Sequence, residues 1–300
     1  MKDNSLKSCE LCPRKCGVDR TKGEAGFCRS SEKIRIAKSS LHFWEEPCIS
    51  GEKGSGTVFF SYCTLKCVYC QNFGISTQNH GRDITIDELS ECFLDLQNQG
   101  ANNINLVTPT HFVPHIISAI EIARKKGLVL PIVYNTSGYE NVETIKMLDG
   151  YVDIFLPDLK YFDDKYAVKY SNAKDYFKTA TAAIKQMYNQ VGKCEFDKNG
   201  IIRKGVIVRH LMLPGLLFDT KKVLDYLYSE YGNNIYISIM SQYTPLSTLP
   251  CNFPELNRRV NPKHYDAILD YAANLGIENA YIQEGSSASE SFIPDFYDDN

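Results

Sequence analysis

The sequence predicts an α/β fold built on a parallel sheet, preceded by a cysteine-rich N-terminal extension. The first observation is alternation: strand-like and helix-like segments form six β/α steps between residues 56 and 245, at roughly 30 residues a step. The second is composition, because 300 residues that are 43% hydrophobic and 23% charged suffice for a large core. Such alternation favours parallel strands joined by helical crossovers.

The expected strands are short runs rich in Val, Ile, Leu and aromatic residues. They are residues 57–62, 104–107, 131–134, 151–156, 205–212 and 235–240. The expected helices carry apolar residues three and four positions apart, and Gly100 and Gly127 end two of them. They are residues 85–99, 112–126, 142–148, 173–191 and 219–231. A further helix over 262–275 and a short strand near 280–282 follow.

This pattern divides the chain into three ranges. Residues 1–55 form a cysteine-rich metal-binding extension, 56–245 the β/α unit, and 246–300 a C-terminal extension. Periodicity does not choose between a barrel and an open doubly wound sheet. No Gly-x-Gly-x-x-Gly follows the first strand, which speaks against a dinucleotide-binding fold.

Charge and hydropathy exclude several classes of partner. The net charge of −3 gives no electrostatic case for nucleic acid binding. No apolar run approaches the roughly 20 residues that span a bilayer, and the first residues lack the apolar core of a signal peptide. We therefore expect a cytoplasmic protein without a membrane partner.

The cysteines point to metal binding. Of 11 cysteines, eight lie within the first 70 residues, and a reducing compartment favours metal ligands over disulfides. Cys63, Cys67 and Cys70 have the spacing C-x3-C-x2-C directly after the first strand, at the sheet edge where parallel α/β folds place active sites. Zinc and Fe–S sites normally need four ligands, so three thiolates on an iron–sulfur cluster leave one iron open. A zinc loop completed by Cys48 or a histidine is the alternative.

With the aromatic Tyr69 before the last cysteine, this triplet resembles the signature of the radical S-adenosylmethionine (SAM) superfamily. The flanking residues 59–63 and 70–76 resemble its pyruvate formate-lyase activating enzyme-like branch. The resemblance implies a partial (β/α)6 TIM-like barrel. It also implies a 4Fe–4S cluster on the three cysteines that reductively cleaves SAM to a 5′-deoxyadenosyl radical. An electron donor such as flavodoxin or ferredoxin would then be a partner.

The later strands end in polar residues, which the barrel would direct toward the cofactor. Asn135, Thr136 and Ser137 resemble the Asp/Ser-Thr-Asn-Gly segment of glycyl-radical activating enzymes, and Asp158 and Lys160 resemble their Asp-x-Lys motif. In place of the usual Gly-Gly-Glu, this chain has a Thr-Pro-Thr segment. The expected cofactor-binding residues are therefore Tyr69, Thr108, Thr110, Asn135, Thr136, Ser137, Asp158, Lys160 and Arg209. A helix cap or surface ion pair is the alternative for Asp158, and a structural ion pair for Arg209.

A second set of cysteines precedes the first strand. Cys9, Cys12, Cys16 and Cys28 form a quartet with glycines between them, which is typical of a small metal-stapled knuckle. Zinc, a second Fe–S cluster and no metal all remain open. About thirty residues separate the quartet from the first strand, so we expect it to be separable from the radical site.

Three functions remain open on the sequence. The first is activation of a glycyl-radical enzyme, and the second is radical modification of a peptide or small molecule without such a partner. The third is a non-catalytic zinc-binding scaffold.

Overall fold

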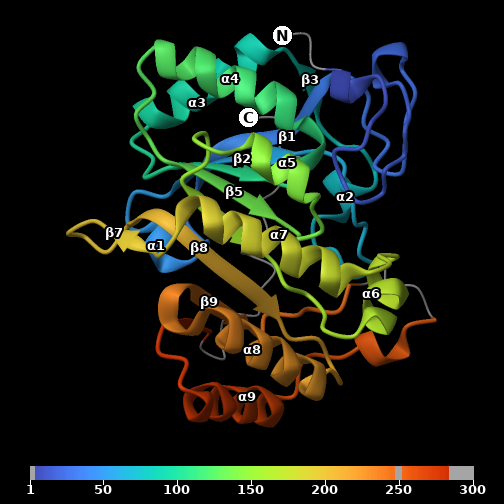
Figure 1. Cartoon of the computed structure of the whole chain (residues 1–300), viewed down its shortest axis with the longest axis vertical. Coiled ribbons are helices and arrows are strands. Elements are labelled where there is room, and N and C mark those ends of the chain that lie inside the picture. The colour runs from blue at the N-terminus through green and yellow to red at the C-terminus, as the bar shows by residue number, and fades with distance from the viewer. Residues whose placement is uncertain (1–3, 247–251, 284–300) are drawn as a thin grey trace.

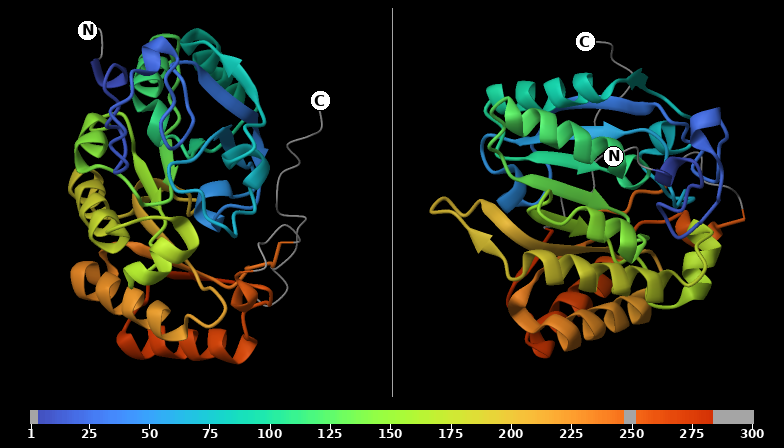
Figure 2. Two further views of the ribbon diagram at one scale, coloured as in Figure 1. Left: turned by 90° about the vertical axis from the view of Figure 1, so that its right-hand side faces the viewer. Right: turned by 45° about the horizontal axis from the view of Figure 1, so that its top comes forward.

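The computed structural model describes residues 4–246 and 252–283 and contains a curved sheet with helices packed along it (Figure 1). The strand order is β10-β9-β8-β6-β5-β4-β2-β1-β3, and β7 pairs with β8 off this path. From β2 to β10 in this order the neighbouring strands are parallel, whereas β1 pairs antiparallel with both β2 and β3. The sheet curls without closing, so the fold is an unclosed parallel β/α barrel (Figure 2).

The strands are mostly short. Their bounds are β1 (Ile34–His42), β2 (Ser55–Phe60), β3 (Arg82–Ile84), β4 (Ile104–Val107), β5 (Ile132–Thr136), β6 (Ile154–Pro157), β7 (Glu195–Phe196), β8 (Ile202–Leu211), β9 (Tyr236–Met240) and β10 (Ala280–Ile282). The helices are α1 (Pro47–Ser50), α2 (Phe73–Ser76), α3 (Ile86–Asn98), α4 (Val113–Lys125), α5 (Val142–Met147), α6 (Asp164–Ser171), α7 (Tyr176–Val191), α8 (Leu217–Tyr231) and α9 (Pro262–Leu275).

Local signals in the sequence set several of these bounds. α3 begins with a capping box, in which the Thr85 hydroxyl accepts from the backbone of Glu88 and the Glu88 carboxylate accepts from the backbone of Thr85. Its face toward the core carries Leu89 and Phe93, both fully buried at helical spacing. Gly276 ends α9 in a left-handed conformation that an L side chain rarely adopts.

Each of the six expected strands is present as β2, β4, β5, β6, β8 or β9, with bounds shifted by a few residues. Sequence reasoning missed the strands β1, β3 and β7 and the helices α1, α2 and α6. In β1 only Ile34 and Ile36 are buried, so its remaining residues resemble a polar loop. The expected helix over 173–191 begins at Tyr176, because Asn172 and Asp175 adopt left-handed conformations that separate it from α6.

The sheet extends beyond the expected ranges on both sides. β1 lies in the range assigned to the extension, yet it pairs with β2 from Ile36 to His42. β10 lies in the range 246–300 and pairs with β9. Residues 247–251 and 284–300 of that range lie outside the described residues. Across residues 4–246 and 252–283, no helix combines the length and apolar character needed to cross a membrane.

Candidate active site

The predicted cysteine triplet lies on the loop that follows β2. This loop turns sharply, and the non-glycine residues Tyr62 and Lys66 adopt positive φ angles of 73° and 58°. Each sulfur accepts a hydrogen bond: Cys63 Sγ from the backbone N of Leu65 at 3.3 Å, Cys67 Sγ from Ser171 Oγ at 3.0 Å, and Cys70 Sγ from Ser76 Oγ at 3.4 Å. Three thiols with donors directed at them suit a thiolate-bound 4Fe–4S cluster with one open iron.

Without a metal, the thiols of Cys67 and Cys70 retain their protons at neutral pH. Burial raises the pKa of Cys67 to about 12, even though the Lys160 ammonium opposes the shift. Burial also raises the pKa of Cys70. Cluster binding therefore releases protons from these thiols and should weaken as the pH falls.

A chain of buried hydroxyl groups leads to Cys67. The hydroxyls of Tyr69 and Tyr161 are 2.7 Å apart, the Tyr161 hydroxyl is 2.7 Å from Ser171 Oγ, and Ser171 donates to Cys67 Sγ. Tyr69, Tyr161 and Ser171 are all buried. Because the Ser171 hydroxyl donates to the sulfur of Cys67, its oxygen can accept a hydrogen bond from Tyr161, and the Tyr161 oxygen can then accept one from Tyr69. Each hydroxyl therefore donates to the next one in the direction of Cys67.

A cavity of about 230 Å³, hereafter the cluster cavity, lies against the triplet loop. Its lining includes Cys67, Tyr69 and Cys70 from the loop, and Asp158, Lys160 and Arg209 from the ends of β6 and β8. The structure thus brings four of the nine predicted cofactor-binding residues (Tyr69, Asp158, Lys160 and Arg209) next to two of the predicted ligands.

Arg209 on β8 is the centre of a buried charge network. Its Nε donates to Asp158 Oδ1 at 3.0 Å, its Nη1 to Glu45 Oε2 at 3.1 Å, and its Nη2 to Asn135 Oδ1 at 2.6 Å. Lys160 Nζ donates to the other Asp158 oxygen at 2.6 Å. A guanidinium with two carboxylates and an amide fixes the ends of β5, β6 and β8 relative to one another.

This network keeps its central pair ionised. Burial by itself would raise the pKa of Asp158, but Lys160 and Arg209 together outweigh it and lower that pKa. Burial likewise opposes the charge on Lys160, yet Asp158 and the nearby Cys67 raise its pKa. Lys160 and Asp158 are therefore both charged at neutral pH, and they face the cluster cavity as an ion pair.

Sequence reasoning missed Glu45 and Glu46, which lie in the loop between β1 and α1. Besides its contact with Arg209, Glu45 accepts from Asn135 at 3.2 Å and from Asn105 at 3.3 Å. Burial raises the pKa of both carboxyl groups, against the pull of Arg209. Two adjacent acids before Pro47 look like a surface loop, and no local signal indicates that the loop enters the barrel.

The threonines after β4 and within β5 have a different environment from the cluster cavity. Thr110 Oγ1 donates to Glu140 Oε1 at 2.5 Å, and the Thr136 hydroxyl donates to the same oxygen. Burial raises the pKa of Glu140 to about 7. Thr108 has a φ of 58°, and its backbone N donates to the carbonyl of Asn135. The Ser137 carbonyl accepts from Tyr176 at 2.9 Å.

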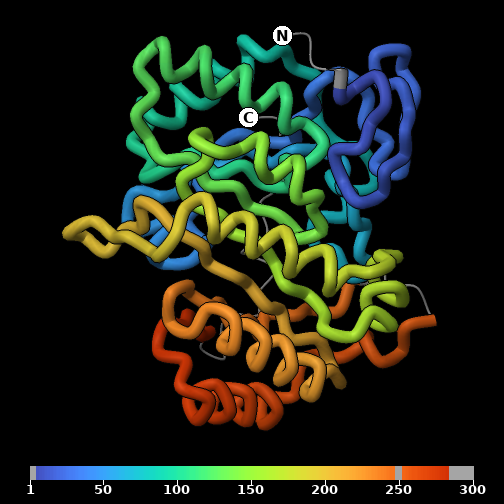
Figure 3. The backbone as a smooth tube through the Cα atoms, in the orientation of Figure 1, coloured from blue at the N-terminus to red at the C-terminus, as the bar shows by residue number. Residues whose placement is uncertain are grey.

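The cysteine quartet belongs to a compact segment over residues 4–33, which forms the blue loops of Figure 3. Its turn is closed by backbone hydrogen bonds between Cys9 and residues 17 and 18. Arg20 is almost fully buried and donates to the carbonyls of Ser31 and His111, with Cys9 Sγ at 3.9 Å from its Nη1. Among the described residues, neither the triplet nor the quartet forms a tight group of three or more metal-binding side chains.

The quartet segment contacts the triplet loop directly through residues other than the quartet cysteines. Arg14 Nε donates to the carbonyl of Thr64 at 3.0 Å, and Lys66 Nζ donates to the carbonyl of Phe27 at 2.5 Å. The Arg14 guanidinium lies 3.8 Å above the centre of the Phe27 ring and also donates to the carbonyl of Asn172. The contact between the two segments was not predictable from the sequence, because about thirty residues separate the quartet from the first strand and the chain folds back onto the triplet loop.

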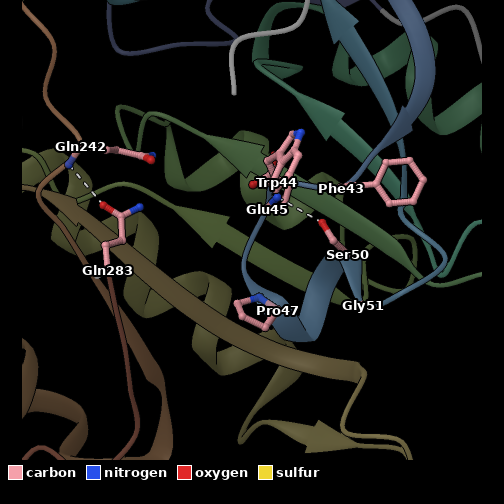
Figure 4. A pocket seen from close by; sticks show the side chains of 8 residues that line it. All are labelled: Phe43, Trp44, Glu45, Pro47, Ser50, Gly51, Gln242 and Gln283. Atoms are coloured by element: carbon pink, nitrogen blue, oxygen red, sulfur yellow. Dashed lines mark hydrogen bonds between the residues drawn. The ribbon is translucent and has the colours of Figure 1, made fainter. Parts of the chain in front are cut away.

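A second cavity of about 460 Å³, hereafter the seam cavity, is lined by Phe43, Trp44, Glu45, Gln242 and Gln283, with α1 below (Figure 4). Residues 43–51 follow β1, whereas Gln242 and Gln283 follow β9 and β10, at the other end of the strand order. The curl of the sheet brings these two ends together. Gln242 also lines the cluster cavity, so the two cavities share a wall.

Comparison with known proteins agrees with this architecture. The sequence profile of the Radical SAM superfamily matches residues 57–227, which is more than half of the chain. The chain therefore belongs to the radical SAM superfamily. The uncharacterized protein MJ0674 of Methanocaldococcus jannaschii is 29% identical over 290 residues, which cover 93% of this chain and 78% of that protein.

Solved structures share the fold. Streptococcus suis SuiB bound to S-adenosylmethionine has a TM-score of 0.51 at 12% identity and covers 77% of this chain. HydG of Carboxydothermus hydrogenoformans, a FeFe-hydrogenase maturase, has a TM-score of 0.52 at 12% identity over 77% of this chain. Methylornithine synthase PylB has a TM-score of 0.51 at 15% identity over 74%. The matches span 52%, 54% and 61% of those chains, respectively.

Proposed function

We propose that this radical SAM enzyme binds a 4Fe–4S cluster through Cys63, Cys67 and Cys70 and cleaves SAM reductively in the cluster cavity. The observation that carries the proposal is that two of these cysteines, Cys67 and Cys70, line the same cavity as the Asp158–Lys160 ion pair. A reduced cluster supplies the one electron that splits SAM into methionine and a 5′-deoxyadenosyl radical. The fold neighbour SuiB was solved with S-adenosylmethionine bound, which supports SAM as the occupant.

The protein's contribution is to orient the methionine end of SAM. Lys160 uses one donor on Asp158, so the ammonium has donors left for the methionine carboxylate. Asp158, held by Arg209, presents negative charge toward the methionine amino group and the sulfonium. Tyr69 forms the wall beside the cysteines. Arg209 and Asn135 act indirectly, since their contacts position Asp158 and Glu45.

The test is iron and sulfide analysis of anaerobically purified protein, coupled to a SAM cleavage assay with dithionite. Cys63→Ala, Cys67→Ala and Cys70→Ala should each lose the cluster and stop forming 5′-deoxyadenosine, because three ligands are the minimum for a cubane with an open iron. Cys92→Ala changes a half-buried cysteine on α3 and is the matched control. This variant should keep both the cluster and the formation of 5′-deoxyadenosine. Full iron content with continued cleavage in any triplet variant would refute the assignment, and zinc without iron would support the scaffold alternative.

Two classes of hydrogen donor are consistent with this chemistry. The first class is a glycine residue of a glycyl-radical enzyme. It is supported by the motifs at residues 135–137 and at Asp158 and Lys160. A peptide or small molecule is supported by the seam cavity beside the cluster cavity. Flavodoxin or ferredoxin is the proposed electron donor. A glycyl-radical signal by electron paramagnetic resonance in a co-purified large partner would identify the first class.

For the quartet we propose a structural metal knuckle. Its support is the buried Arg20, whose hydrogen-bond partners are carbonyls, the Ser30 hydroxyl and Cys9 Sγ. A buried guanidinium is costly without negative charge nearby, and metal-bound thiolates at Cys9 and Cys28 would supply that charge. The same metal analysis tests this site: Cys12→Ser with Cys28→Ser should lose one zinc, or a second cluster, while the main cluster remains.

A further inference from the structure

The seam cavity has an unusual wall of exposed aromatic side chains. Trp44 is 62% exposed and Phe43 is 48% exposed, whereas Phe218 is the one other large aromatic residue that is exposed among those the structure describes. Both residues lie in the same loop as Glu45. The hydrogen bond from Arg209 to Glu45 fixes this loop, and so holds Phe43 and Trp44 in place. Aromatic faces held at a cavity favour stacking with a flat apolar group.

The cavity offers little free charge to a ligand. Glu45 is the charged residue in its lining, and both of its carboxylate oxygens already accept hydrogen bonds from Arg209, Asn105 and Asn135. Among the residues that the structure describes, no lysine or arginine lines the cavity, so this part of the chain offers no cation to a phosphate or carboxylate ligand. A neutral ligand avoids the desolvation cost that a charge would incur.

The carboxamides of Gln242 and Gln283 lie on one side of Trp44, and the Phe43 ring lies on its other side (Figure 4). Gln283 Oε1 accepts from the backbone N atoms of Ser241 and Gln242, which fixes the side chain and leaves its NH₂ group as a donor. The Gln242 NH₂ group makes a long contact of 3.9 Å with Met240 Sδ, and its Oε1 has no partner within the described part of the chain. One donor and one acceptor match the C=O and N–H of a single amide group.

We propose that the seam cavity binds a neutral, peptide-like amide ligand by stacking its aromatic side chain on Trp44 and pairing its amide with Gln242 and Gln283. Naming this ligand the hydrogen donor rests on the proposed function, because the shared wall at Gln242 places the ligand beside the cluster cavity. A volume of about 460 Å³ lies within the usual range for small-ligand sites.

Trp44 is the single tryptophan of the chain, so its fluorescence reports on this cavity alone. The experiment titrates the full-length protein with N-acetyl-phenylalaninamide. The neutral probe should change the emission saturably, whereas N-acetyl-phenylalanine, which carries a carboxylate, should bind at least tenfold more weakly. Gln242→Leu should weaken binding of the neutral probe about tenfold, which corresponds to the loss of one or two hydrogen bonds.

Gln97→Leu is the matched control, because the Gln97 amide contacts Gly127 and Val129 on the far side of α3 and should not affect binding. Equal binding of the two probes, or unchanged binding in Gln242→Leu, would overturn the proposal, as would the absence of a fluorescence change. The titration needs neither cluster nor SAM. Absent binding with intact SAM cleavage would therefore refute this inference alone, and binding without cleavage would refute the proposed function alone.

Discussion

Ser171 lies at the end of α6, and its hydroxyl directs a proton at the sulfur of Cys67. Hydrogen bonds to cluster sulfurs stabilise the added negative charge of the reduced state and so raise the reduction potential. Tyr161 and Tyr69 polarise this hydroxyl further, since each donates toward the next.

We therefore expect Ser171→Ala to lower the reduction potential of the cluster in a titration monitored by electron paramagnetic resonance. Tyr69→Phe, which removes the distant end of the hydroxyl chain, should lower it less. Ser118→Ala is the control, because Ser118 on α4 donates only to the carbonyl of Pro114. An unchanged or higher potential in Ser171→Ala at full iron content would contradict this role.

Local sequence predicted some of the candidate site and not the rest. The spacing of the triplet and the polar residues at strand ends predicted Cys67, Asp158 and Arg209 as neighbours, and the structure places all three at the cluster cavity. Glu45 could not be predicted, because its role depends on a loop from the antiparallel strand β1 entering the barrel. Thr110 was predicted to bind the cofactor as a polar residue at a strand end. Nothing in the neighbouring sequence indicated that its hydroxyl would instead donate a hydrogen bond to Glu140.

At the scale of elements, Glu140 joins the ends of β4 and β5. One of its oxygens accepts from Thr110 and Thr136, in a fully buried position where the pKa rises to about 7. A carboxyl group whose pKa is higher in the folded state stabilises the fold below its unfolded pKa of 4.5. That stability is lost as the pH rises through 7, and the full loss is about 3 kcal/mol.

Glu140→Gln should remove this loss, so its unfolding free energy should fall less than that of the wild type between pH 4.5 and 8. Guanidinium unfolding at a series of pH values measures the difference between the two proteins. Glu143→Gln, at an 81% exposed side chain on α5, is the matched control and should parallel the wild type. If Glu140→Gln also parallels the wild type, Glu140 is not the group that titrates.

The elements themselves were predictable where a segment is buried on both faces. β2 is buried along its whole length, and the apolar residues Val58, Phe59 and Phe60 at its end indicated a strand. β1 borders the sheet with only two buried residues, and its pairing with β2 comes from long-range contacts that a local pattern does not contain. The short helix α6 was missed for a related reason, because only part of its length is buried.

At the scale of the whole molecule, the segment over residues 4–33 clamps the triplet loop. Arg14 spans three parts of the chain: its guanidinium stacks on Phe27, donates to the carbonyl of Thr64 in the triplet loop, and donates to the carbonyl of Asn172 after α6. Lys66, between two of the cysteines, donates back to the carbonyl of Phe27. The N-terminal segment thus holds both the loop and the helix end that carries Ser171.

We expect Arg14→Gln to remove the contacts of Arg14 with the triplet loop and with Asn172 without unfolding the barrel. Charge-assisted hydrogen bonds contribute about 1.5–3 kcal/mol each, so their loss should raise amide hydrogen exchange over residues 63–70 by one to two orders of magnitude. Arg124→Gln is the matched control, since Arg124 donates to the carbonyls of Gly150 and Tyr151 on the far side of the barrel. Hydrogen exchange read by mass spectrometry should show faster exchange at 63–70 in Arg14→Gln and not in Arg124→Gln. Equal protection of 63–70 in both variants would mean that the triplet loop keeps its conformation without the contacts of Arg14.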